Sequence, residues 1–259
     1  MIQLTSSVKK ILYLNVFVFL CCKIFHDPII DFGALHNLLS PQFRWYQLIT
    51  HLFIHLSFWH LCGNIITLMT FGPAVEDMLG NKQFILFYLI VGIGASGLYL
   101  LVSYLLNYQG HKLFLDYLDN PSPEVFEQYV RQFTTFYHNN YGFIYDYLYD
   151  PTNTNLIAKS KSIMSYLYGA YYCSPCVGAS GAVFGVLTAF AMFYPQALLT
   201  PMFLPIPISA RSIVLFYGLY ELVAGMTSNN SFDNIAHSAH IGGILISYLI
   251  IKISNIRRS

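Results

Sequence analysis

Charged side chains are scarce in this sequence. Only 10% of its 259 residues are Asp, Glu, Lys or Arg, whereas 56% are hydrophobic. A soluble globular domain carries about 25% charged residues, so an ordinary soluble enzyme is not expected. The net charge of +1 offers no basic surface for nucleic acid, and 21 Phe with 21 Tyr exclude intrinsic disorder. The composition therefore indicates a polytopic membrane protein, with the lipid bilayer as its surroundings.

Cysteine is also infrequent. The five cysteines are too few and too scattered for a disulfide scaffold. Cys173 and Cys176 form a lone CxxC, which is compatible with a disulfide, a redox pair or a metal-binding pair. Without a second pair the motif does not choose among these, and the bonding of the two cysteines stays open.

Long apolar runs dominate what is present. They predict an all-α membrane protein with six transmembrane helices, at about residues 11–25, 60–79, 84–107, 180–194, 209–226 and 235–254. Lys9 and Lys10 before the first run resemble the start of a signal peptide. No small-residue cleavage site follows, so we expect the first helix to be retained.

The distribution of basic residues predicts the orientation. Six helices place both termini on one side of the membrane, together with most of the basic residues outside the large insertion: Lys9, Lys10, Lys82, Arg211, Lys252, Arg257 and Arg258. The opposite short loop carries Arg44, with Lys23 at its edge. The positive-inside rule therefore predicts that both termini are cytoplasmic.

One long segment interrupts this pattern. We interpret residues 1–259 as a single membrane domain in which 108–177 forms an extended insertion on the non-cytoplasmic side. The insertion is polar and rich in tyrosine, and Pro123–Tyr137 is expected to form an amphipathic helix. It is interpreted either as an interfacial cap that affects substrate access or as a mobile loop without a role.

Polar residues inside apolar runs are costly in a membrane and often functional. His51 and His55 lie one helical turn apart; they are either interfacial histidines facing water or a metal-binding pair. No Glu in an HExxH pattern accompanies them. His60 and Asn64 share one face at the start of the second membrane helix, where their hydrogen-bond donors are suited to an oxyanion.

Two further groups begin later helices. Ser180 lies between Gly178 and Gly181, and these glycines allow close backbone approach; packing between helices is the simpler explanation of such a motif. His240 begins the last helix and is either a buried, hydrogen-bonded histidine or a base that reaches the Ser180 hydroxyl. In the six-helix topology His60, Ser180 and His240 all lie at the non-cytoplasmic ends of their helices, which favours a common site.

The ordered motifs resemble those of the rhomboid intramembrane serine proteases. They are HxxxN at His60 and Asn64, GxSG at Gly178–Gly181, and AHxGG at Ala239–Gly243. The stretch Tyr46–Gly80 is similar to the family's first loop and second helix nearly throughout. The resemblance covers about residues 8–256 of the chain. It is greatest to bacterial members of the Bacteroidota type, which implies an integral protein of the bacterial cytoplasmic membrane.

The resemblance implies a role for each matching residue. Ser180 is the expected nucleophile and His240 the general base, in a dyad without an aspartate. His60, Asn64 and the Ser180 backbone N–H are the expected oxyanion donors, and His55 is expected to shape the water-filled cavity. The activity implied is cleavage of peptide bonds in or near transmembrane helices of membrane protein substrates. No metal or other cofactor is expected.

Two positions depart from the family pattern. Phe184 stands where the ring that packs on the base histidine is often Tyr, and we expect a phenyl ring to stack as well. The Trp-Arg pair of the first loop is replaced by Tyr46-Gln47.

Two other classes of function compete with the protease. A catalytically silent rhomboid-like protein that binds membrane clients predicts loss of the serine or histidine, and both are present. A small transporter or channel predicts an inverted repeat or a membrane-centred ion site, and the sequence has neither.

Overall fold

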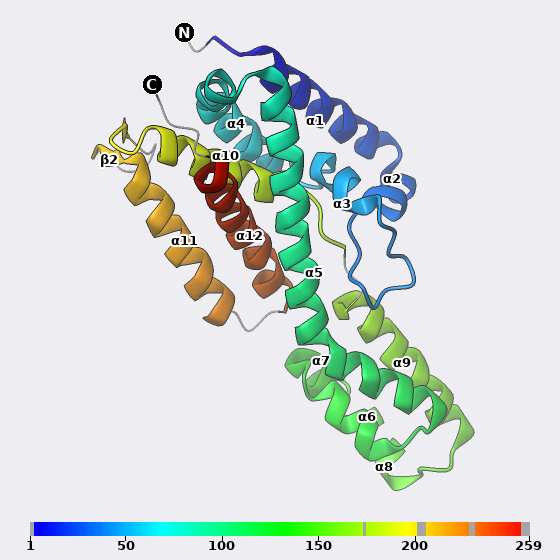
Figure 1. The fold of residues 1–259 in the computed structure, drawn as a ribbon. Helices are drawn as coiled ribbons and strands as arrows, with labels where there is room; N and C mark the ends of the chain where they lie inside the picture. Colours follow the sequence, from blue (N-terminus) through cyan, green and yellow to red (C-terminus); the bar gives the residue numbers. More distant parts are fainter. Residues whose placement is uncertain (1–2, 173–174, 201–205, 228–230, 255–259) are drawn as a thin grey trace. The chain divides into compact units, whose positions relative to one another are not determined.

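A computed structural model describes residues 3–172, 175–200, 206–227 and 231–254 (Figure 1). The described chain is almost wholly helical, and it divides into two compact units. The first unit comprises Met1–His36, Gln42–Val102 and Pro175–Ser259, and the second comprises Asn37–Pro41 and Ser103–Ser174.

The first unit contains the helices that coincide with the apolar runs, and the long helix α5 continues into the second unit. Its elements are α1 (Ser6–Ile24), α2 (His26–Gly33), α3 (Gln47–Thr50), the 3₁₀ turn η1 (His51–Phe53), α4 (Phe58–Leu79), α5 (Asn81–Asp119), β1 (Leu198–Leu199), β2 (Ile208–Ser209), α10 (Ser180–Phe193), α11 (Ala210–Thr227) and α12 (Ser231–Ser254). The strands β1 and β2 pair antiparallel in the connection between α10 and α11.

Each of the six predicted runs coincides with one of these helices. By length and apolar composition, α5 and residues 237–254 of α12 are candidate membrane spans, and the bent pair 47–53 and 58–79 is a third. These apolar helices indicate an integral membrane protein. Six crossings and the orientation of the termini stay predictions.

Helix α10 forms the centre of the first unit. It is 14 residues long, shorter than the roughly 20 residues that cross a bilayer alone. Ten of its fourteen residues are buried, and it packs against α4, α11 and α12 (Figure 1). Because other helices surround it, α10 is held by protein contacts rather than by lipid.

The first helix is anchored to the end of α4 by a buried carboxylate. Glu76 accepts hydrogen bonds from the backbone N–H groups of Ser7 and Val8, both at 2.9 Å, and from the Thr5 hydroxyl. These N–H groups have no acceptor inside α1, so the carboxylate caps the helix and complements its dipole. Gly80, with a φ of 81°, then turns the chain from α4 into α5.

The second unit has a hydrophobic core of its own. Its remaining helices are α6 (Pro123–Val130), α7 (Thr134–Asn139), α8 (Tyr141–Tyr149) and α9 (Thr154–Tyr172). They pack with the end of α5 around aromatic side chains, among them Tyr117, Tyr129 and Tyr147. The part of the insertion that the structure describes is therefore a folded helical unit. Its place on the non-cytoplasmic side stays a prediction.

The helix predicted at Pro123–Tyr137 is wrong in its extent. It is two helices, because the backbone leaves the helical region at Phe133, with a φ of −109° and a ψ of 74°. The start is as expected for such a sequence: the Ser122 hydroxyl caps α6 by accepting from the N–H of Val125, and Pro123 occupies the first turn.

Candidate active site

Ser180 is the first residue of α10, and the backbone before it is unusual. Gly178 has a φ of 117°, which disfavours any side chain, and a Cβ there would lie 2.4 Å from Cε1 of His60. Its N–H donates to the carbonyl of His51 at 2.9 Å. The glycine therefore lets the chain pass close to His60 and begin a helix at Ser180.

Close contact between α10 and α12 brings the serine to the last helix. A Cβ on Gly243 would lie 2.0 Å from the carbonyl oxygen of Gly181. One turn further, the Ser247 hydroxyl donates to the carbonyl of Gly185 at 2.7 Å. Small residues on both helices thus allow the backbones to touch, a device common in membrane helix pairs.

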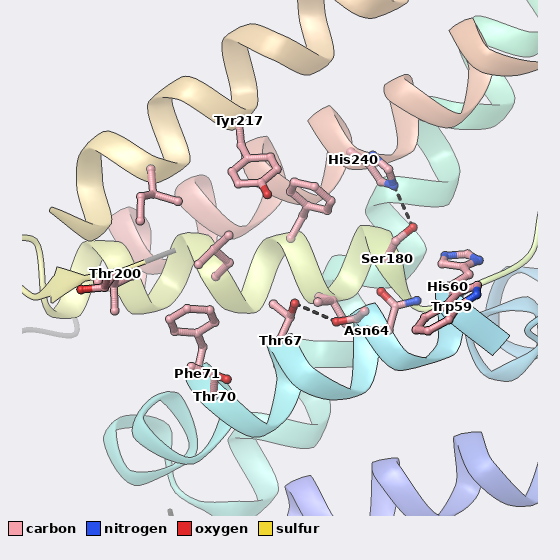
Figure 2. A pocket seen from close by; sticks show the side chains of 16 residues that line it. Trp59, His60, Asn64, Thr67, Thr70, Phe71, Ser180, Thr200, Tyr217 and His240 are labelled. Atoms are coloured by element: carbon pink, nitrogen blue, oxygen red, sulfur yellow. Dashed lines mark hydrogen bonds between the residues drawn. The ribbon is translucent and has the colours of Figure 1, made fainter. Parts of the chain in front are cut away.

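The two helices place Ser180 Oγ and His240 Nε2 2.9 Å apart (Figure 2). General-base catalysis needs a heavy-atom distance of about 2.6–3.2 Å. Phe184 lies one turn after Ser180 and stacks on His240, with ring centroids 4.4 Å apart and an interplanar angle of 21°. The phenyl ring therefore lies nearly parallel to the imidazole, and its role in orienting His240 stays a prediction.

Ser180 and His240 line a cavity of about 570 Å³ between α4, α10, α11 and α12. Figure 2 shows Trp59, His60 and Asn64 reaching it from α4, opposite His240. Because α10 begins at Ser180, the backbone N–H of Ser180 has no acceptor within the helix. His60, Asn64 and Ser180, which carry the three expected oxyanion donors, thus line the same cavity.

His55 lies behind this wall and does not line the cavity. Its Nε2 accepts from the Asn64 amide at 2.9 Å and lies 3.4 Å from the N–H of Ala179. Its ring meets the His60 ring edge to face, with centroids 5.1 Å apart. His55 therefore contacts Asn64 and His60 from the side away from the cavity.

His51 is buried, and both of its ring nitrogens contact other groups of the protein. Its Nδ1 donates to the carbonyl of Gln47 at 2.6 Å, and its Nε2 lies 3.1 Å from the Ser96 hydroxyl. With both ring nitrogens engaged, the metal-binding interpretation of His51 and His55 is not supported. Cys173 of the CxxC motif lies outside the described residues.

Sequence reasoning missed one functional candidate, Glu221 on α11. Its carboxylate is buried and its Oε2 lies 2.5 Å from Nδ1 of His237 and 3.0 Å from Nδ1 of His240. A glutamate inside the apolar run 209–226 was the signal that could have found it, since such a residue needs a partner in a membrane.

The same three side chains offer ligand atoms within 4.8 Å of one another. Two ligands about 2.0 Å from a tetrahedral zinc ion lie about 3.3 Å apart. The 2.5 Å contact between His237 and Glu221 is shorter than this and corresponds to a hydrogen bond. The cluster is thus described better as a hydrogen-bond network than as a metal centre.

Comparison with known proteins agrees with the arrangement of the motifs. The family model of the Rhomboid domain matches residues 42–112 and 151–255, more than half of the chain. The chain belongs to the rhomboid family. The unmatched stretch between the two matches, 113–150, falls within the second unit.

Several curated relatives carry the rhomboid name. The chain is 39% identical over 70 residues to rhomboid protease GluP of Bacillus subtilis, covering 27% of this chain and 14% of that protein. It is 24% identical over 247 residues to rhomboid protease AarA of Providencia stuartii, covering 92% of this chain and 68% of that protein. It is 25% identical over 237 residues to the mitochondrial RHOMBOID-like protein 12 of Arabidopsis thaliana, covering 90% of this chain and 54% of that protein. The chain thus spans only part of the length of GluP and of the plant protein.

Proposed function

We propose that this rhomboid protein is an intramembrane serine endopeptidase that cleaves membrane protein substrates in or near a transmembrane helix. The observation that carries the proposal is the 2.9 Å separation of Ser180 Oγ and His240 Nε2 at the wall of a cavity. A serine that only packed two helices would have no need of an imidazole in line with its hydroxyl. The similarity to GluP and AarA, both named as rhomboid proteases, supports the same class.

The proposed reaction uses a serine nucleophile. Ser180 Oγ attacks the carbonyl carbon of the scissile bond while its proton passes to His240 Nε2. The carbonyl oxygen becomes an oxyanion, stabilised by donors from His60, Asn64 and the Ser180 N–H. The C–N bond then breaks as His240 returns the proton to the leaving amine. Water attacks the acyl-enzyme with His240 again as base, and this releases the acid and restores Ser180.

The helix of a substrate hides its carbonyls in its own hydrogen bonds. A cleavable segment must therefore unwind locally before a carbonyl reaches Ser180, which favours small or helix-breaking residues at the cut. We place the enzyme in a bacterial cytoplasmic membrane with six crossings and both termini in the cytoplasm. In this orientation the site opens on the non-cytoplasmic side.

The test compares purified wild type with Ser180→Ala and His240→Ala in detergent or in liposomes. A reporter substrate with one transmembrane helix is incubated with each, and products are identified by mass spectrometry. We expect cleavage by the wild type alone, with all three proteins equally folded by thermal melting and gel filtration. Undiminished cleavage by the Ser180→Ala protein would refute the assignment. A wild type that binds the substrate but never cuts it would favour the silent, client-binding alternative.

A further inference from the structure

Buried carboxylates in apolar surroundings are costly unless they are paired. Glu221 is 4% exposed on α11, a helix whose outer face carries exposed apolar side chains such as Leu215, Phe216 and Leu219. Its partners are two imidazoles of α12. Pairing with these imidazoles is therefore what offsets the cost of burying the Glu221 carboxylate.

One carboxylate oxygen serves both histidines. Glu221 Oε2 accepts a short hydrogen bond from His237 and lies at ion-pair distance, 3.0 Å, from Nδ1 of His240. Nδ1 of His240 is itself buried and has no aligned hydrogen-bond partner among the described residues. The remaining ring nitrogen, Nε2, already faces Ser180. At 3.0 Å, Glu221 Oε2 is within hydrogen-bonding distance of Nδ1.

We propose that Glu221 is a positioning residue that extends the serine and histidine into a Ser180–His240–Glu221 relay of contacts, with His237 holding the carboxylate in place. This inference rests on the proposed protease function. By accepting from Nδ1–H, the carboxylate keeps the imidazole in the tautomer whose Nε2 is free to take the serine proton. It also stabilises the imidazolium that forms when the proton arrives. The family resemblance implies a dyad of serine and histidine alone, and Glu221 adds an acidic residue to it.

The other charged or titratable groups facing His240 do not provide this. His60 approaches from α4 and His237 from the same helix, and both are imidazoles that offer no negative charge. From α10 the facing group is the Ser180 hydroxyl. Glu221, from α11, is the carboxylate of this set.

The decisive comparison is Glu221→Gln against His237→Ala. If the carboxylate acts on His240, Glu221→Gln lowers kcat by about 10- to 100-fold with KM nearly unchanged, a part of the roughly 10²–10⁴ that general-base catalysis supplies. The acidic limb of the pH–rate profile moves to lower pH, because imidazole without a carboxylate neighbour takes up its proton less readily. Glu221→Asp, which keeps the charge, leaves the limb in place and recovers part of kcat.

A purely structural role gives a different pattern. If Glu221 merely holds His237, then Glu221→Gln and His237→Ala have the same effect and neither moves the acidic limb. Equal behaviour of these two variants would overturn the inference. Glu127→Gln is the matched control, because Glu127 pairs with Arg131 in the second unit. This variant should change neither kcat nor the acidic limb of the pH–rate profile.

A readout without turnover separates this inference from the proposed function. The His240 imidazole is titrated by nitrogen NMR in Ser180→Ala protein, with and without Glu221→Gln. We expect Nδ1 to carry the proton of the neutral ring when Glu221 is present, and the titration midpoint to fall when it is absent. An unchanged tautomer and midpoint would overturn the role of Glu221, whether or not the wild type cleaves any substrate.

Discussion

The two units bury different kinds of side chain. The core of the first unit around α10 is built from small and aliphatic residues, such as Ala182, Val186 and Ala189. Six of the ten buried residues in the core of the second unit are Phe or Tyr, against four of sixteen in the first. Small side chains let the backbones of α10 and α12 touch in the first unit, whereas aromatic rings make up most of the buried core in the second.

Polar groups are used differently as well. In the second unit, the buried Tyr117 hydroxyl bonds to Ser160 and Tyr147, which satisfies the polar tips of aromatic rings inside the core. In the first unit the polar side chains of Ser180 and His240 line a cavity instead. The comparison teaches that the candidate site lies where two helix backbones touch, because this close approach holds Ser180 and His240 2.9 Å apart beside a cavity.

Among these variants, the largest fall in kcat is expected for Asn64→Ala, which removes one proposed oxyanion donor. Removing such a donor typically lowers kcat by about 10²–10³-fold. Asn64→Ala should do so with little change in KM, and it also removes the amide that bonds His55. Single-turnover cleavage of the reporter substrate measures the change. Asn140→Ala, in the second unit, should leave kcat unaltered; equal losses in both variants would contradict the assignment of the oxyanion site.

Spacing between helices should matter next. Gly243→Ala places a methyl group against the carbonyl of Gly181, where the Cβ would lie only 2.0 Å away. The helices must separate, which costs about 1–3 kcal/mol and displaces His240 from Ser180. We expect at least about tenfold lower kcat, since a misplacement near 1 Å can cost about 10²-fold, and a lower melting temperature.

The matched change is Gly169→Ala on α9, where a Cβ meets nothing within 4 Å. Alanine favours an exposed helix by up to about 1 kcal/mol over glycine. The second unit should therefore be equally or more stable, with cleavage unchanged. A neutral Gly243→Ala would show that α10 and α12 do not depend on close approach.

A smaller effect is expected at the stacked ring. Phe184→Leu removes the partner of His240, and aromatic contacts of this kind are worth about 0.5–1.5 kcal/mol, or roughly 2- to 10-fold in kcat. Phe184→Tyr keeps the ring and should preserve activity. Phe114→Leu removes the stack on Tyr168 in the second unit and should affect melting but not cleavage. Equal activity of wild type, Phe184→Leu and Phe184→Tyr would show that the ring does not position the base.

The smallest effect on chemistry should follow from removing most of the second unit. Replacing residues 113–150 with a Gly/Ser linker deletes the stretch between the two family matches. Hydrolysis of a small soluble ester should stay within about twofold, because Ser180 and His240 belong to the first unit. Changed cleavage of the membrane substrate alone would support a cap that affects access. Loss of ester hydrolysis would contradict it.

Much of the candidate site follows from local sequence. Gly178 next to a helix start, His60 one turn before Asn64, and His240 at the start of the last run each mark their own position by residue type and spacing. Their expected common depth follows from the predicted order of the membrane helices. The apolar runs likewise locate the helices, although the helix expected at Pro123–Tyr137 is interrupted because local turns at its centre compete with the amphipathic pattern.

The sequence by itself determined the membrane class, the helix positions, the family motifs and the residues with the right chemistry, since these depend on composition and on spacing along one helix. Tertiary structure alone decided which atoms meet. The 2.9 Å between Ser180 and His240, the support of Asn64 by His55, and the contact of Glu221 with His240 each join residues from different elements. Spacing within a helix says which side chains share a face, but a contact between helices depends on their crossing and register, which small residues such as Gly243 set through backbone packing.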